Sequence, residues 1–246
     1  MRADWIQYVD SKRQFSFLRT LETLSSLQDQ DTMNFIIIGA LPLLIAGYLR
    51  YIVFWDFDLL FKDKPSLQGF NTLKKPADLR IVEYDDQLMI GSHIASFHTA
   101  WTFCTKWINV DYILKKDAYD FYKHNLLDRG PWRQSIDHEG MTYSVSLFMA
   151  HPWDVITEKI LSPRTARDLQ LGVDTSVDIR HILAVFRKDG ANVAFWGHLM
   201  ARVRHIGDVD TFKTTFWRII KHADALGYTD ITIPDIAAAA LGQKTK

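Results

Sequence analysis

The alternation of apolar and polar residues divides the chain into a first part with strand patterns and a second part with helix patterns. Apolar residues recur at helical spacing over residues 5–27, which predicts one or two amphipathic helices. Residues 33–38 and 52–61 are rich in β-branched and aromatic residues and predict two strands. The segment between them, residues 41–49, is apolar all round and predicts a buried helix that begins just after Gly39.

The middle of the chain carries further strand patterns. A helix is expected over residues 65–75, and residues 80–114 are rich in strand formers that fit several strands. The clearest of these strands is 107–114, where apolar and polar positions alternate. Residues 126–140 hold Gly130, Pro131 and Gly140 among charged residues and predict mostly loop, and residues 141–149 predict one more strand.

Beyond residue 151 the strand patterns stop. Five later segments have helix patterns: 152–161, 175–187, 192–204, 210–226 and 234–241. The predicted fold class is therefore α+β, with a sheet-containing first part in residues 1–150 and a helical C-terminal region in residues 151–246.

Composition narrows the class of protein. The chain has 246 residues, 48% of them hydrophobic, so it can bury a substantial core without disulfides or structural metals. Lysine and arginine balance aspartate and glutamate at 29 each, so net charge gives no argument for nucleic acid, although a local basic face remains possible. The single cysteine, Cys104, fits a reducing compartment and is interpreted as a buried small hydrophobe.

The apolar run over residues 35–49 is shorter than the ~20 residues that a membrane-spanning helix needs. The N-terminus shows no short apolar core ending in small residues, so no secretory signal is expected. We therefore expect a cytoplasmic protein with no membrane partner.

The candidate chemistry begins with two aspartates two residues apart. Asp56 and Asp58 lie in a predicted strand, where residues two apart project from the same face. Two carboxylates side by side in an apolar strand are costly unless a cation lies between them. Mg²⁺ is the usual cation, commonly with substrate phosphates completing its coordination shell.

Gly39 and Ala40 supply a second candidate element. They have almost no side chain at the start of the predicted helix, so its N–H groups and positive dipole end are open to an anion. A small-residue turn, a helix and an acidic-pair strand would together hold a polyphosphate against metal ions. Phosphoryl or nucleotidyl transfer needs this arrangement, because its catalysis is mostly positioning and charge neutralisation.

The pattern strand, Gly-Ala, helix, strand and Asp-Phe-Asp resembles the nucleotidyltransferase superfamily, most closely its minimal and abortive-infection (AbiEii) toxin-like branch. The resemblance covers about residues 33–187 and implies a nucleotidyltransferase-like mixed β-sheet flanked by helices. It implies a third acidic residue on a later strand, which Asp111 matches. It also implies that Lys159 lies near the nucleotide phosphates, with Asp178 in a supporting role.

The resemblance implies an Mg²⁺-dependent enzyme that moves a nucleoside monophosphate from an NTP to a hydroxyl or phosphate acceptor, which could be RNA, protein or a small molecule. Asp56 and Asp58 would bind the metals, Asp111 would complete the second site, and the active site would lie in the cleft between the two regions. Ala40 and Trp55 depart from the family pattern, so a non-catalytic interaction or antitoxin module remains an alternative.

A further alternative is a haloacid-dehalogenase-type phosphatase, with Asp56 as nucleophile and Asp58 as acid. That family has Gly and Thr or Val where Leu59 and Leu60 stand here. The histidines form no metal-binding pattern, so His93 and His98 are interpreted as structural or surface groups. The aromatic residues over 101–107 are interpreted as sheet core rather than a base-stacking platform.

Overall fold

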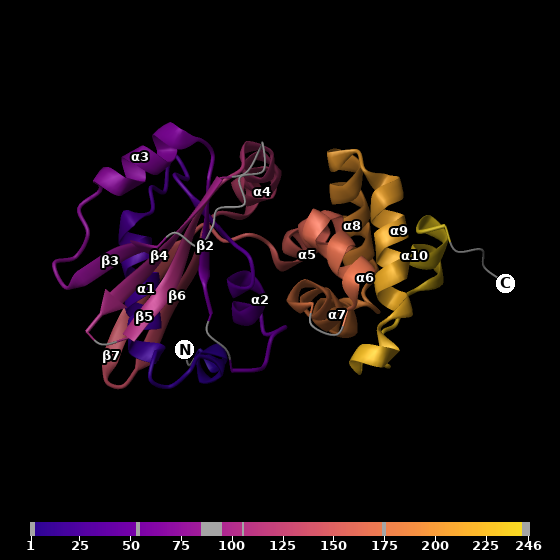
Figure 1. The fold of residues 1–246 in the computed structure, drawn as a ribbon, viewed down its shortest axis with the longest axis horizontal. Coiled ribbons are helices and arrows are strands. Elements are labelled where there is room, and N and C mark those ends of the chain that lie inside the picture. Colours follow the sequence, from indigo (N-terminus) through magenta and orange to yellow (C-terminus); the bar gives the residue numbers. More distant parts are fainter. Residues whose placement is uncertain (1–2, 53–54, 85–94, 105, 174–175, 243–246) are drawn as a thin grey trace. The chain divides into compact units, whose positions relative to one another are not determined.

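The structure is a computed structural model that describes residues 3–52, 55–84, 95–104, 106–173 and 176–242. His93 therefore lies outside the described residues. The chain divides into two compact units, unit 1 over Met1–His151 and unit 2 over Pro152–Lys246 (Figure 1).

Unit 1 contains all the strands that the structure describes. Its elements in chain order are η1 (Asp4–Tyr8), α1 (Gln14–Leu27), β1 (Ile36–Ile38), α2 (Leu41–Ile45), β2 (Phe57–Phe61), α3 (Lys64–Thr72), β3 (Leu79–Tyr84), β4 (Ala95–Phe103), β5 (Lys106–Leu114), α4 (Lys116–Arg129), β6 (Trp132–His138) and β7 (Met141–Leu147).

Five strands form one mixed sheet in the order β1-β2-β5-β4-β3. β2 and β5 run parallel, whereas β1 pairs with β2, β4 with β5 and β3 with β4 in antiparallel fashion. β6 and β7 form a separate antiparallel hairpin. The predicted α+β class with a mixed sheet is confirmed.

One face of the five-stranded sheet is apolar and covered by helices. Phe57 and Phe61 of β2 and Tyr112 of β5 are buried on this face. The ring of Phe17 in α1 lies 4.8 Å from that of Phe57, and the ring of Phe70 in α3 lies 5.7 Å from that of Tyr112. Since strand residues alternate between faces, the polar residues between these aromatics project from the opposite face.

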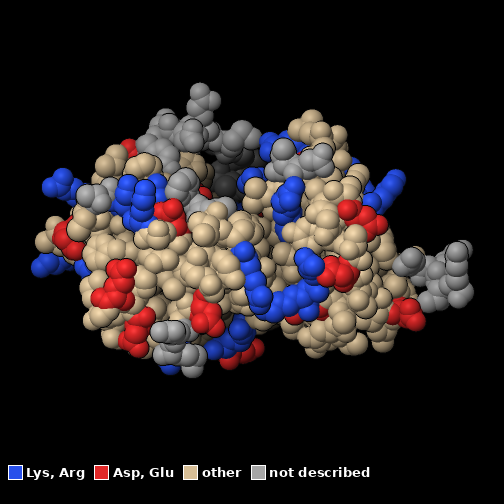
Figure 2. Space-filling model, turned by 90° about the horizontal axis from the view of Figure 1, so that it is seen from below, with Lys and Arg blue, Asp and Glu red and all other residues tan. Residues whose placement is uncertain are grey.

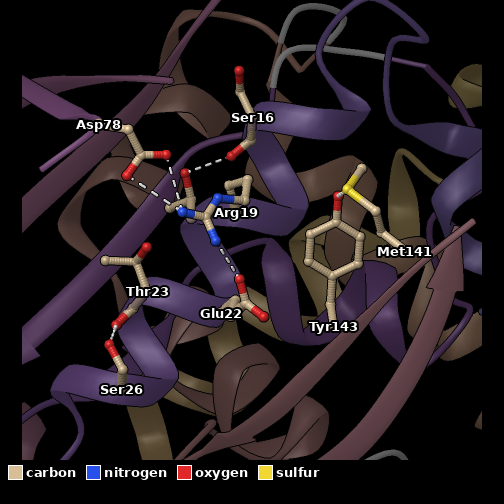
Figure 3. A network of polar contacts seen from close by, with 9 residues as sticks. Ser16, Arg19, Glu22, Thr23, Ser26, Asp78, Met141 and Tyr143 are labelled. Atoms are coloured by element: carbon tan, nitrogen blue, oxygen red, sulfur yellow. Dashed lines mark hydrogen bonds and ion pairs between the residues drawn. The ribbon is translucent and has the colours of Figure 1, made fainter. Parts of the chain in front are cut away.

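Helix α1 is also held by polar contacts (Figure 3). The guanidinium of Arg19 lies 2.6 Å from a carboxylate oxygen of Glu22 and 3.0 Å from one of Asp78, the residue before β3. In the same helix the hydroxyl of Thr20 donates to the carbonyl of Ser16 at 2.8 Å, which satisfies a buried polar group. Of these contacts, the one to Asp78 joins α1 to the segment before β3, and the other two lie within the helix.

In unit 2 every element that the structure describes is a helix. These are α5 (Pro152–Leu161), α6 (Pro163–Leu171), α7 (Val177–Asp189), α8 (Val193–Ile206), α9 (Val209–Lys221), η2 (Asp224–Leu226) and α10 (Asp235–Ala240). Its core contains an aromatic cluster in which the ring of Phe186 lies 5.8 Å from that of Phe195 and 5.4 Å from that of Phe216. The helical C-terminal region is therefore confirmed.

Several elements differ from the sequence prediction. The loop expected over residues 126–140 is wrong, because the last turn of α4 and the whole of β6 lie there, separated at Gly130. The helix expected over residues 41–49 is shorter in the structure, because α2 ends at Ile45. Two residues later, Gly47 adopts a positive φ of 74°. Helix α6 was not expected, although Ser162 caps it and Pro163 begins it.

Two expectations concern exposure and membranes. Cys104 is exposed between β4 and β5 with a φ of 62°, so its interpretation as a buried hydrophobe is wrong. Within the described ranges, no helix combines the length and the apolar character needed to cross a bilayer. Lys and Arg as well as Asp and Glu side chains occur on the face shown in Figure 2, so the neutral total arises from charges of both signs.

Candidate functional site

The register of the sheet places the candidate carboxylates together. Asp58 of β2 is the direct partner of Asp111 on the parallel strand β5, and Asp111 is also the partner of His98 on β4. Paired residues project from the same face, so these three side chains form a row across the sheet. This face is opposite the one that α1 and α3 cover.

Asp56 joins the same face just ahead of β2. The strand begins at Phe57, later than the start expected at residue 52, and Asp56 is the residue before it. The side chain of Asn109, which lies two residues before Asp111 on β5, donates a hydrogen bond to the Asp56 carboxylate. The three predicted carboxylates therefore lie near one another on one face.

The surroundings oppose ionisation of two of these acids. Burial raises the pKa of Asp111, while His98, whose Nδ1 lies 3.0 Å from Oδ1 of Asp111, opposes the shift. Although Asp56 as a whole residue is exposed, desolvation also raises the pKa of its carboxyl, and the charge of Asp111 adds repulsion. Asn109, His98 and Arg13 act in the other direction. A cation at this face would relieve the repulsion.

Gly39 lies against Asp58. It follows β1 with a φ of 75°, and a Cβ built on it would fall 1.8 Å from Oδ2 of Asp58. Only glycine combines this backbone conformation with so close an approach to the carboxylate. The observed role of Gly39 is to make room for Asp58.

The helix after Gly39 gives weak support for an anion site. Ala40 is the N-cap of α2, and its carbonyl accepts hydrogen bonds from the N–H groups of Leu43 and Leu44. The helix has only five residues, so few aligned peptide dipoles contribute at its N-terminus. Phosphate binding by Gly39 and Ala40 stays a prediction.

Lys159 and Asp178 form an ion pair within unit 2. Nε of Arg164 lies 3.5 Å from the other carboxylate oxygen of Asp178. Burial alone would raise the pKa of Asp178, but Lys159 and Arg164 together lower it. Burial lowers the pKa of the neighbouring His181 to about 3, and the charge of Lys159 adds to this effect. A contact from Lys159 to nucleotide phosphates, and the cleft between the two regions, stay predictions.

The donor set at the carboxylate face suits a hard divalent cation. Among the residues that the structure describes, no group of three or more His, Cys, Asp or Glu side chains is arranged to hold a metal ion. Mg²⁺, however, is usually bound by one or two carboxylates together with water and substrate phosphates. Asp56 and Asp58 fit that pattern of partial coordination.

No protein-family model matches the chain, and no curated protein does. Among solved structures it is similar to an antigenic nucleotidyltransferase-like protein from Paracoccidioides brasiliensis, with 14% identity and a TM-score of 0.47 over 93% of this chain and 98% of that one. It is also similar to a protein from H. pylori proposed to be a nucleotidyltransferase, with 14% identity and a TM-score of 0.42 over 95% and 92% of the two chains. At this level the likeness concerns the arrangement of elements alone.

The structure adds residues to the site that the sequence did not single out. His98 contacts Asp111, although it was interpreted as a structural or surface group. Trp107 is 50% exposed, so its interpretation as sheet core is wrong, whereas Trp101 and Phe103 are buried as expected. The alternation along β5 indicates the location of these residues, because it places Trp107 and Asn109 on the same face as Asp111.

Proposed function

We propose that the chain is an Mg²⁺-dependent nucleotidyltransferase that moves a nucleoside monophosphate from an NTP to a hydroxyl or phosphate acceptor. The observation that carries this proposal is the direct pairing of Asp58 with Asp111 on adjacent parallel strands, with Asp56 beside them. Three acids gathered on one face of the sheet, two of them with raised pKa values, are costly for folding and are typical of functional sites.

Each carboxylate has a role in this proposal. Asp56 and Asp58 would supply oxygen ligands to Mg²⁺, and Gly39 keeps the loop after β1 clear of Asp58. When bound, Mg²⁺ would neutralise the triphosphate and polarise the phosphoryl oxygens. Asp111 lies beside both and has a raised pKa, so its carboxylate is suited to accept a proton from an acceptor hydroxyl. His98 orients that carboxylate through its Nδ1 contact.

A non-catalytic nucleotidyltransferase-like interaction module is the second candidate. It is favoured by the contacts that His98 and Asn109 make to two of the acids, because such contacts stabilise a carboxylate without any metal. This module would retain the sheet and its acids but would not bind an NTP in a metal-dependent way.

Calorimetry with an NTP distinguishes the two candidates. The nucleotidyltransferase should bind NTP only with Mg²⁺, and the double variant Asp56→Asn with Asp58→Asn should lose this binding. The exposed Asp120 of α4 provides a matched control, since Asp120→Asn removes an acid from the same unit outside the strands. Equal binding with and without Mg²⁺ would favour the interaction module.

A second assay addresses the reaction. Wild-type protein incubated with labelled NTP and cellular RNA or protein should transfer the label. Release of inorganic phosphate from small phosphoesters, together with an acyl-phosphate on Asp56, would instead identify a phosphatase.

A further inference from the structure

A small pocket opens next to Asp56, within unit 1. It has a volume of about 240 Å³. Its lining comes from Val9, Arg13, Phe17, Trp55, Asp56, Trp107, Ile108 and Asn109, so apolar side chains form part of the wall. Pockets that enclose a whole drug-sized ligand usually measure about 300–1,000 Å³. This pocket therefore suits one ring system of a ligand whose remainder lies outside.

Two of the lining residues form a fixed platform. The guanidinium of Arg13 lies over the indole of Trp107, 4.5 Å from the ring centroid, and also donates a hydrogen bond to the Trp107 carbonyl. Trp55 is held as well, since its Nε1 donates to the carbonyl of Tyr8 at 2.8 Å. A held cation and two held indoles lose little conformational freedom when a ligand binds.

The platform lies on the same sheet face as the acids. Trp107, Asn109 and Asp111 are alternate residues of β5, so they project from one face at intervals of roughly 6.6 Å. Asn109 contacts Asp56, and Asp111 pairs with Asp58. The part of a ligand that contacts Trp107 and Asn109 would thus lie in line with the carboxylates along one strand.

The lining selects a particular chemistry. One cation and one carboxylate border the pocket, so neither a phosphate nor an ammonium group is favoured inside it. Guanidinium and indole planes favour a flat ring, because bases stack on arginine and aromatic side chains. The Asn109 side chain adds an amide, which can hydrogen-bond to the edge of a base. A neutral, planar, hydrogen-bonding ring satisfies all three conditions.

We propose that this pocket receives the nucleobase of the NTP whose phosphates meet Asp56 and Asp58. The proposal rests on the nucleotidyltransferase function proposed above. It makes Trp107 and Arg13 the residues that hold the base.

The test compares binding of Mg²⁺ complexes of ATP, GTP, CTP and UTP with binding of Mg²⁺–inorganic triphosphate, which lacks a base. Trp107→Ala should weaken NTP binding by about tenfold or more, since stacking on an aromatic side chain contributes strongly to base binding. Triphosphate binding should not change. Arg13→Lys keeps the charge but removes the planar guanidinium, and should also weaken only NTP binding.

Phe97 provides the control. It is 42% exposed on β4 but projects from the opposite face of the sheet, so Phe97→Ala should leave both ligands unaffected. Circular dichroism confirms that each variant is folded.

The outcomes distinguish a failure of the base pocket from a failure of the proposed function. If Mg²⁺–triphosphate binds through Asp56 and Asp58 but Trp107→Ala leaves every NTP unaffected, the base pocket is refuted and the proposed function stands. Equal weakening of NTP and triphosphate also refutes the pocket, because the variant then acts on the carboxylates. If Trp107→Ala weakens only a short single-stranded RNA, the base held there is the acceptor's, and the assignment to the NTP is wrong. Failure of both ligands to bind the wild type overturns the proposed function itself.

Discussion

The close approach of Gly39 to Asp58 predicts that adding a single methyl group at residue 39 lowers the stability of unit 1. In Gly39→Ala the backbone must keep a φ of 75° with an L side chain, which costs about 1–2 kcal/mol. The new Cβ would also overlap Oδ2 of Asp58, 1.8 Å away, and such overpacking adds about 1–3 kcal/mol. The free energy of unfolding of unit 1 should therefore fall by about 2–5 kcal/mol, the sum of these two contributions.

The two contributions can be separated in a double-mutant cycle. In an Asp58→Ala background the carboxylate is absent and only the Cβ of residue 58, 3.2 Å away, remains close. Gly39→Ala should then cost little more than the backbone part, about 1–2 kcal/mol. Gly69→Ala in α3 is a matched control, because a Cβ there meets no atom within 4 Å and the helix favours alanine by up to about 1 kcal/mol.

Urea unfolding followed by circular dichroism measures all four proteins of the cycle and the control. Gly39→Ala should also weaken Mg²⁺-dependent NTP binding, because the displaced Asp58 carboxylate no longer faces the ion. An equal cost of Gly39→Ala with and without the Asp58 carboxylate would refute the close approach, and a neutral Gly39→Ala would refute the backbone argument too.

Further predictions concern single residues. Asp111→Asn should leave NTP affinity nearly intact but greatly slow transfer of labelled nucleotide, because only the transition state needs the complete site. Lys159→Met should destabilise unit 2 by about 3–5 kcal/mol in urea unfolding, since it leaves the buried Asp178 with one cation fewer. The pKa of His181 falls from 6.5 to about 3 on folding, so folding disfavours its protonation. Thermal melts should therefore show the contribution of His181 complete above pH 6.5 and declining as pH falls towards 3, with a shallower decline in His181→Phe. Cys104 is exposed, so a thiol reagent should label it in the native protein.

The sequence predicts those features of the fold that depend on the spacing of residues within one strand or helix. The spacing of Asp56 and Asp58 predicted a shared face, and alternation along residues 107–114 predicted a strand, which the structure has as β5. What could not be predicted is the register that makes Asp58 the partner of Asp111. The two paired residues lie more than fifty positions apart in the chain. The alternation of apolar and polar residues within each strand does not specify which residues of the two strands pair.

The predicted boundaries of loops and helices were wrong for a different reason. Gly130 and Pro131 predict a loop, yet they occupy a short boundary between α4 and β6. Glycine and proline mark where an element ends, but they carry no information about how soon the next begins. Packing decides that length, and Tyr119 and Tyr122 of α4 are buried by tertiary contacts that the sequence alone does not display.

The exposure of Trp107 follows from its position in β5 and not from the aromatic run to which it belongs. Its neighbours Trp101 and Phe103 are buried, and a run of aromatic residues in a sheet is most often core. Trp107, however, lies four residues before Asp111 on β5, so alternation projects the indole from the same face as the acid. Leaving a large aromatic side chain half exposed forfeits about 1 kcal/mol or more of burial energy. The proposed nucleobase would cover this half-exposed indole beside Asp56, where the guanidinium of Arg13 already lies over the ring.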